Sequence, residues 1–330
     1  MLLHCTIIAK ARRRILSAVF LFAAFIAGAQ QYNFLKYSVR DGLAEAKVSC
    51  VFQDKEGYLW IGTEAGASRF DGTEFENFDA TNGLPGNMVT AISENEQGIL
   101  LATDSGVAVY NKGKFSLSAF PASEKGRTIS AIAKNEEGVV ILATDKGVLS
   151  FVKGKFNRII TSTPIDALQV SCAYFDSKNK LWIGTKENGL WRLTENNKVF
   201  TNENFPDQDK LANDHVRGVT ELEDGEIWIA TSNDGLFSFD GNVVNKLILP
   251  EKIRTDNFSC IHKDMFGDIW LGTWGSGVIH YTKSAFKIYN KQNGLDDDIV
   301  TCITSDRQGN TWFGTFSEGL VFFYGDKFTA

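Results

Sequence analysis

A few acidic and imidazole side chains stand just ahead of apolar stretches, where ligand or catalytic groups are often placed. Asp214 and His215 precede one stretch, and Asp256 and Asn257 precede another. Two carboxylates and a histidine are the groups that acid–base chemistry uses. Cleavage of a polysaccharide needs two carboxylates roughly 5 to 10 Å apart, or a histidine and an acid around a metal. Their spacing is compatible with a lyase or a glycan hydrolase, but it does not identify a catalytic residue.

Two aromatic residues in comparable loops suggest stacking of a ligand. Trp274 and Phe316 each follow a threonine that ends an apolar stretch, and they suit a sugar-like or planar molecule. The alternative is that both rings pack against a neighbouring structural unit. Asn87 and Asp297 lie in loops of the other kind, which lead into apolar stretches. Asp297 belongs to a run of three aspartates that also fits a solvated loop.

A recurring segment must position all these residues. Residues 48–71 contain an alternating apolar stretch, a turn at Gly57 and a second apolar stretch that ends at Thr63. Equivalent threonines recur at intervals of 40 to 46 residues, which gives seven units. These are Thr63, Thr103, Thr144, Thr185, Thr231, Thr273 and Thr315.

This period predicts an all-β fold, a seven-bladed β-propeller with four-stranded antiparallel blades. Sheets of such short strands do not bury their faces alone, so each must stack on its neighbours. A large side chain three residues before the threonine is expected to be the wedge between adjacent blades. The tryptophans at this position are Trp60, Trp182, Trp228, Trp270 and Trp312.

The ring is expected to close through a strand borrowed from the N-terminus. Residues 34–43 match the fourth strand and following loop of other units, whereas the last unit stops at Ala330 with that strand incomplete. We predict that a strand at about residues 33–39 completes the last blade and removes open sheet edges.

The first 29 residues are typical of an export signal. Three arginines at 12–14 precede an apolar run at 15–28, which is too short to span a bilayer, and cleavage is expected near Ala29. Residues 30–330 would then be one propeller domain, periplasmic or secreted. Without the leader the chain has 30 basic and 40 acidic residues, which disfavours nucleic acid and anionic membrane surfaces as partners.

The turns and the cysteines both favour structural roles. Most units carry Asp or Asn three residues before the turn Gly or Asn. One carboxylate per blade cannot supply the six to eight oxygens that calcium takes, so we expect these side chains to accept backbone N–H groups. The cysteines share a position that holds Ala or Gly in other units, which indicates crowding and predicts free thiols, with no metal or cofactor. They are Cys50, Cys172, Cys260 and Cys302.

The loops between second and third strands fall into two classes. Units one to three have two residues between the threonine and the next glycine, as in Glu64-Ala65. Units four to seven have three, as in Trp274-Gly275-Ser276. One side of the channel mouth is therefore predicted to differ from the other.

The segments DKEGYLWIGTEAGASRFDG at 54–72 and DSKNKLWIGTKENGLWRL at 176–193, with Asn-Gly-Leu loops before first strands, resemble the two-component regulator propeller repeat. The resemblance covers Phe34 to Ala330. It implies an exported, non-catalytic sensor region of a bacterial hybrid two-component system, of the kind implicated in detecting polysaccharide breakdown products. The membrane helix and kinase domain of such systems are not in this sequence, so kinase activity is not implied.

The sequence is therefore compatible with three functions. The first is a sensor propeller that binds an unidentified small ligand, such as an oligosaccharide, and reports it to other signalling proteins. The second is a propeller enzyme that uses Asp214, His215 and Asp256. The third is a protein-interaction scaffold, which burial of Trp274 and Phe316 between blades would favour.

Overall fold

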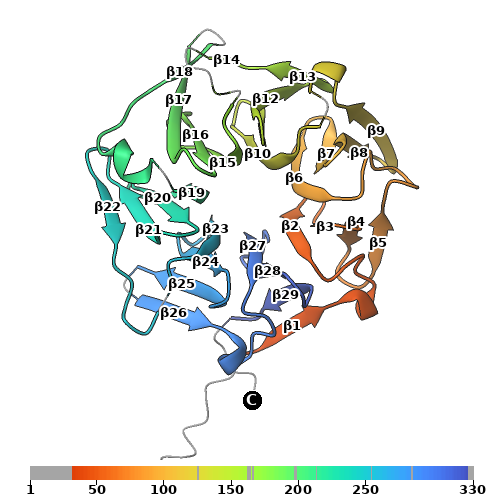
Figure 1. The fold of residues 1–330 in the computed structure, drawn as a ribbon. Helices are drawn as coiled ribbons and strands as arrows, with labels where there is room; N and C mark the ends of the chain where they lie inside the picture. The colour runs from red at the N-terminus through yellow and green to blue at the C-terminus, as the bar shows by residue number, and fades with distance from the viewer. Residues whose placement is uncertain are drawn as a thin grey trace, which may run out of the picture.

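The computed structural model describes residues 32–325 except 125, 162–164, 166, 197, 198, 213, 254 and 284. Seven small sheets stand around a central axis, so the predicted seven-bladed β-propeller is confirmed (Figure 1). The proposed leader at 1–29 lies outside the described residues. No helix in the described part of the chain is long and apolar enough to span a membrane. The short 3-10 helices are η1 (Val39–Asp41), η2 (Ala122–Glu124), η3 (Gln208–Leu211) and η4 (Lys291–Asn293).

The innermost strand of each blade lines the axis and packs beside its counterparts in the neighbouring blades. Each of these strands shifts register after its first residue, so its second residue occupies a bulge. Bulges re-aim side chains, and this one recurs at the same place in every blade. In blade order the strands are β2 (Val48–Gln53), β6 (Val89–Asn95), β10 (Ile129–Lys134), β15 (Val170–Phe175), β19 (Val216–Glu221), β23 (Phe258–Lys263) and β27 (Val300–Ser305).

The second strands form the core, because both of their faces are covered by adjacent blades. The wedge prediction is confirmed, since the tryptophans on these strands are no more than 7% exposed. The second strands are β3 (Leu59–Thr63), β7 (Gly98–Thr103), β11 (Val140–Thr144), β16 (Leu181–Thr185), β20 (Ile227–Thr231), β24 (Ile269–Thr273) and β28 (Thr311–Thr315).

The third strands pair antiparallel with the second and complete the inter-blade packing. Two of them, in blades 1 and 2, begin at a glycine, Gly66 or Gly106, that packs closely against the backbone of the fourth strand. They are β4 (Gly66–Phe70), β8 (Gly106–Asn111), β12 (Gly147–Val152), β17 (Leu190–Asn196), β21 (Leu236–Phe239), β25 (Val278–Thr282) and β29 (Leu320–Phe323).

The outermost strands face solvent on the rim of the ring. Blade 4 differs from the prediction by carrying a fifth, parallel strand, β14 (Ile160–Thr161), beside its outer strand. The outer strands are β5 (Phe75–Phe78), β9 (Lys114–Ala119), β13 (Lys155–Arg158), β18 (Val199–Asn202), β22 (Val244–Leu247), β26 (Ala285–Tyr289) and, in blade 7, β1 (Phe34–Tyr37).

Ring closure by the N-terminal strand occurs as the sequence predicts. β1 pairs antiparallel with β29, with Phe34 opposite Phe323 (Figure 1). Lys36 adds an ion pair to Glu318 with 2.7 Å between Nζ and Oε2. Tyr37 stacks 6.0 Å from the wedge Trp312. The closing strand therefore contributes to the last core as well as to the edge.

The turn aspartates accept backbone N–H groups, which confirms the turn interpretation. Asp54 Oδ1 accepts the N–H groups of Glu56 and Tyr58. Its Oδ2 also accepts the indole N–H of Trp60 at 2.8 Å. Blades 4, 6 and 7 repeat this bond. The carboxylate thus gives the buried indole N–H the partner that it needs.

The four cysteines are free thiols, as predicted. Each lies against a glycine of the adjacent second strand: a Cβ at Gly62 would come 2.5 Å from Cys50 Sγ. Burial raises the pKa of Cys50 and Cys172 to about 12. These thiols are therefore small core groups rather than nucleophiles.

Candidate functional site

A repeated hydrogen bond joins neighbouring innermost strands. In five blades a Ser or Thr at the bulge donates its hydroxyl to the carbonyl of the first residue of the next innermost strand. Thr90 reaches Ile129 at 2.6 Å, and Thr301 joins blade 7 to Val48 at 2.5 Å. Blade 5 has Arg217 at this position instead.

Arg217 is directed toward the loops at the channel mouth instead of forming that bond. Its Nε donates to Ser232 Oγ at 2.7 Å, and its guanidinium carbon lies 5.8 Å from the ring centre of Trp274. Burial lowers the pKa of Arg217, because a half-buried guanidinium has lost part of its hydration. Blade 5 thus places a cation where other blades place a hydroxyl.

Trp274 and Phe316, on consecutive blades, come together beside this cation. Their rings meet edge to face, 6.1 Å apart and 63° inclined. Trp274 is 37% exposed and Phe316 39% exposed, so neither is buried between blades. The condition that would have favoured a scaffold is not met.

A second cation continues the row on blade 1. Lys47 Nζ lies 4.9 Å from the Phe316 ring centre and forms an ion pair with Glu64 at 2.5 Å. We call the four residues from blades 5, 6, 7 and 1 the mouth arc: Arg217, Trp274, Phe316 and Lys47. It offers two exposed aromatic surfaces between two positive charges, which suits a ring or sugar that carries polar or anionic groups.

Two predicted site residues, His215 and Asn257, lie next to the mouth arc, whereas the charged neighbours of Asp214 are Asp234 and Lys246. Burial, with the charges of Arg217 and Lys186, lowers the pKa of His215 to about 4, so the ring is neutral at pH 7. Burial raises the pKa of Asp214. Asp214 Oδ2, His215 Nε2 and Asn257 Oδ1 are enclosed and have no hydrogen-bond partner among the described residues, which is costly for polar atoms in a protein.

The remaining predicted residues have other surroundings. Asp297 is 4% exposed and accepts N–H groups from Ile299 and Ser317 and the Ser317 hydroxyl, so it holds two loops together beneath Phe316. Asn87 accepts the N–H of Ala80 on blade 2, away from the mouth arc. Asp297 therefore lies close to the loop of Phe316 with its carboxylate used by loop donors, and Asn87 does not reach the aromatic pair.

Asp256 lines a separate hollow near the outer part of blades 5 and 6. This hollow has a volume of about 460 Å³ and includes Lys246 and Ile248. No hydrogen bond joins the side chains of Asp214, His215 and Asp256 to one another. The acid–base set that an enzyme would require is thus not assembled by hydrogen bonding.

Arg217 was missed by the sequence-based site prediction, although the repeat contains the signal. The residue after the first position of the innermost strand is Ser or Thr in six units and Arg only in the fifth. The six are Ser49, Thr90, Ser130, Ser171, Ser259 and Thr301.

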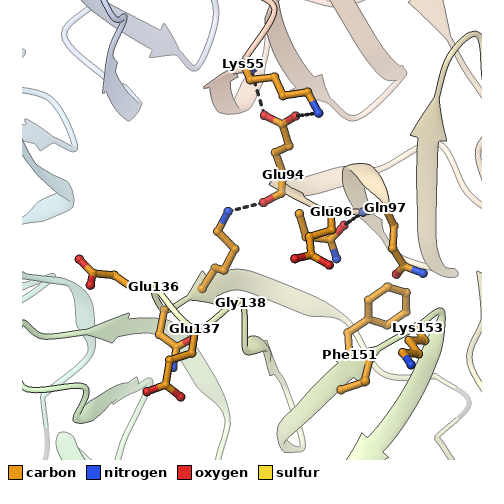
Figure 2. Close-up of a pocket in the computed structure, with 13 residues that line it drawn as sticks. Lys55, Glu94, Glu96, Gln97, Glu136, Glu137, Gly138, Phe151 and Lys153 are labelled. Carbon is orange, nitrogen blue, oxygen red and sulfur yellow. Dashed lines mark hydrogen bonds and ion pairs between the residues drawn. The ribbon is translucent and has the colours of Figure 1, made fainter.

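The opposite face of the ring, formed by the hairpins between first and second strands, carries another hollow. It has about 560 Å³ and lies between blades 2 and 3 (Figure 2). Lys55 pairs with the Glu94 carboxylate, 3.3 Å from Nζ to Oε1, and Lys134 bonds the Glu94 carbonyl. Glu136 and Glu137 are exposed at its edge. Its charges are of both signs, and its one aromatic lining residue, Phe151, is only 2% exposed.

One His–Asp group on this face has ligand atoms within 4.8 Å of one another: Asp264, Asp268 and His280. Asp264 accepts the Trp270 indole N–H and two backbone N–H groups, as equivalent aspartates do in blades without a histidine. His280 stacks on Trp270 at 3.7 Å and bonds Asp268 at 3.0 Å. The turn and the wedge account for these contacts.

Comparison with known proteins supports the repeat assignment. The family model described as Two component regulator propeller matches residues 42–65 and 294–317. The chain carries regulator-propeller repeats. The chain also shares 40% identity over 60 residues with Histidine kinase P4 of Formosa agariphila, a span of 18% of this chain and 4% of that protein.

Solved structures agree on the fold. The extracellular domain of the hybrid two component system BT3049 from B. thetaiotaomicron superposes with a TM-score of 0.72 at 23% identity, over 88% of this chain and 42% of that one. Virginiamycin B lyase from Staphylococcus aureus gives 0.69 at 14% identity, over 88% and 99%. At identities this low, the structural likeness supports the fold of this chain and does not indicate its function.

Proposed function

We propose that this protein is an exported, non-catalytic sensor propeller that binds a small ligand, such as a glycan fragment, at the mouth arc. The observation that carries the proposal is the exposed aromatic pair Trp274–Phe316 beside Arg217. Exposed aromatic surface flanked by fixed polar groups is typical of a binding site. Export and signalling are supported by the repeat match and by the likeness to a hybrid two component system.

An enzymatic role has less support. The lyase likeness extends to the fold alone, and His215, with a pKa of about 4, is a weak proton acceptor at neutral pH. Hydrogen bonding does not orient His215 through Asp214 or Asp256. A lyase assay with a panel of glycans and cyclic peptides would overturn the non-catalytic proposal if any turnover disappeared in His215→Ala.

The binding proposal is tested by a thermal-shift and tryptophan-fluorescence screen of glycan fragments and small metabolites. A bound ligand raises the melting temperature by mass action. Trp274→Ala is expected to weaken a hit by about 10- to 100-fold, the range for loss of an aromatic anchor. Asp104→Ala, at the equivalent loop position of blade 2, is the matched control and should change affinity less than about twofold. Absence of any hit across a broad panel, or equal effects of the two substitutions, would contradict the proposal.

A further inference from the structure

Arg217 stands apart from the other arginines that are at least partly buried in the described chain. Arg69, Arg127 and Arg192 each form an ion pair with a glutamate. Arg217 forms no ion pair with a described residue, and its one hydrogen bond within the described part of the chain runs from Nε to the neutral hydroxyl of Ser232. Its two terminal nitrogens therefore have no protein acceptor among the described residues.

This absence is informative because the chain is acidic. It has 40 acidic residues against 34 basic ones, so carboxylates are numerous enough to pair with a guanidinium. An unpaired and partly desolvated cation is unfavourable in the free protein. A group that lowers stability and is aimed at an exposed aromatic pair is the arrangement expected of a binding residue.

The surroundings favour an anion and disfavour a second cation. Lys186, on blade 4, is exposed, and its charge acts together with that of Arg217 on His215. At the other end of the mouth arc, Lys47 is already paired with Glu64. Arg217 is thus the cation of the mouth arc whose charge is left for a ligand.

We propose that the ligand of this propeller carries a carboxylate, which binds the terminal nitrogens of Arg217 while an adjoining ring lies on Trp274 and Phe316. This rests on the proposed function and specifies its ligand class: an acidic saccharide or a similar carboxylated ring. A planar guanidinium matches a carboxylate with two parallel N–H···O bonds. Nε is held by Ser232, and the guanidinium carbon lies 5.8 Å from the ring centre of Trp274.

The test uses uronic-acid oligosaccharides and their carboxyl-reduced counterparts, which differ only in the acidic group. The acidic form is expected to bind at least tenfold more tightly to the wild-type protein, as for a hydrogen bond to a charged group. Arg217→Met should remove this preference without affecting the neutral form. Arg217→Lys, which keeps the charge and loses the two parallel bonds, should retain part of the preference. Sulfated saccharides that bind as tightly as the uronates would overturn the assignment to a carboxylate.

A second measurement needs no ligand. If Arg217 serves binding, Arg217→Met should leave the melting temperature of the free protein unchanged or raise it. Arg192→Met, which breaks an ion pair of a guanidinium also placed over a tryptophan, should lower it. A fall for Arg217→Met equal to that for Arg192→Met would indicate a structural role and overturn the proposal.

The outcomes separate the two proposals. Equal binding of acidic and neutral forms, both lost in Trp274→Ala, would refute the carboxylate and leave the binding function standing. No binding of either form, together with no hit in the wider screen, would refute both.

Discussion

The two halves of the loop face share one backbone framework and carry different chemistry. In blades 2 to 7 the residue after the second strand donates its N–H to the carbonyl just before the innermost strand, as Asp104 does to Met88 and Trp274 to Asn257. That residue is acidic in blades 1 to 3, which we call the acidic half. It is Lys, Ser, Trp or Phe in blades 4 to 7, which we call the aromatic half. A repeat fold thus fixes the backbone at each blade and lets one side chain per blade set the properties of the mouth.

Loop length follows the same division. In blades 1 to 3 the closing threonine bonds the carbonyl of the glycine three residues on, as Thr63 does with Gly66. In blades 4 to 7 it bonds the glycine four residues on, as Thr273 does with Gly277. The extra residue is compatible with the same threonine hydrogen bond, so the sequence could change loop length without loss of the framework.

The sharpest test of this comparison contrasts a wedge tryptophan with the mouth tryptophan. Trp182→Ala should lower the free energy of unfolding by about 3–5 kcal/mol, because it empties a fully buried site. Trp274→Ala should lower it by less than about 1 kcal/mol, because its ring is more than one-third exposed. Chemical denaturation of both variants measures the difference. Equal losses would mean that the aromatic half is a core and not a binding surface.

A smaller effect is expected where the loops are held together. Asp297→Ala should cost about 1–3 kcal/mol, because it leaves the donors of Ile299 and Ser317 without an acceptor beneath Phe316. Asp145→Ala, on the acidic half, removes one such bond, to Thr128, and should cost about 1 kcal/mol. If Asp297→Ala proved the milder substitution, the aromatic half would not be the more tightly held of the two.

The smallest expected effect is a pH dependence that comes from the aromatic half. Both His215 and His262 have pKa values lowered to about 4, mainly by burial, against 6.5 for an ordinary histidine. The unfolded chain therefore takes up protons first, so stability is complete above pH 6.5 and falls as the pH drops toward 4. His215→Gln should make this decline shallower between pH 6.5 and 5. A slope identical to that of the wild type would show that His215 does not titrate in this way.

The fold was predictable because its determinants are local and repeated. The turn glycine, the closing threonine and the wedge tryptophan recur at fixed spacing, and seven copies leave one ring architecture. The borrowed strand β1 was predictable for the same reason, since its residues match other outer strands. The short strand β14 has no counterpart in other blades, so the repeat gave no reason to expect it.

The site was only partly predictable because it depends on which blades are neighbours in space. Trp274 and Phe316 were found from their loop position, and the structure shows that their rings meet. Asp297 is of a residue type that often binds ligands, yet its carboxylate accepts loop N–H groups. Sequence spacing does not reveal these hydrogen bonds. Arg217 stands at the bulge of an innermost strand, and the direction that a bulge gives to a side chain cannot be read from the sequence.

Closure by β1 also constrains how the protein can fold. Lys36 and Glu318 meet across 282 positions of sequence, so blade 7 is completed only after nearly the whole chain has emerged. Pairings this distant form slowly. Until then the N-terminal strand has an unsatisfied backbone, which is prone to pair with other chains. The same strand that closes the finished ring therefore presents an unpaired edge until β29 is available to pair with it.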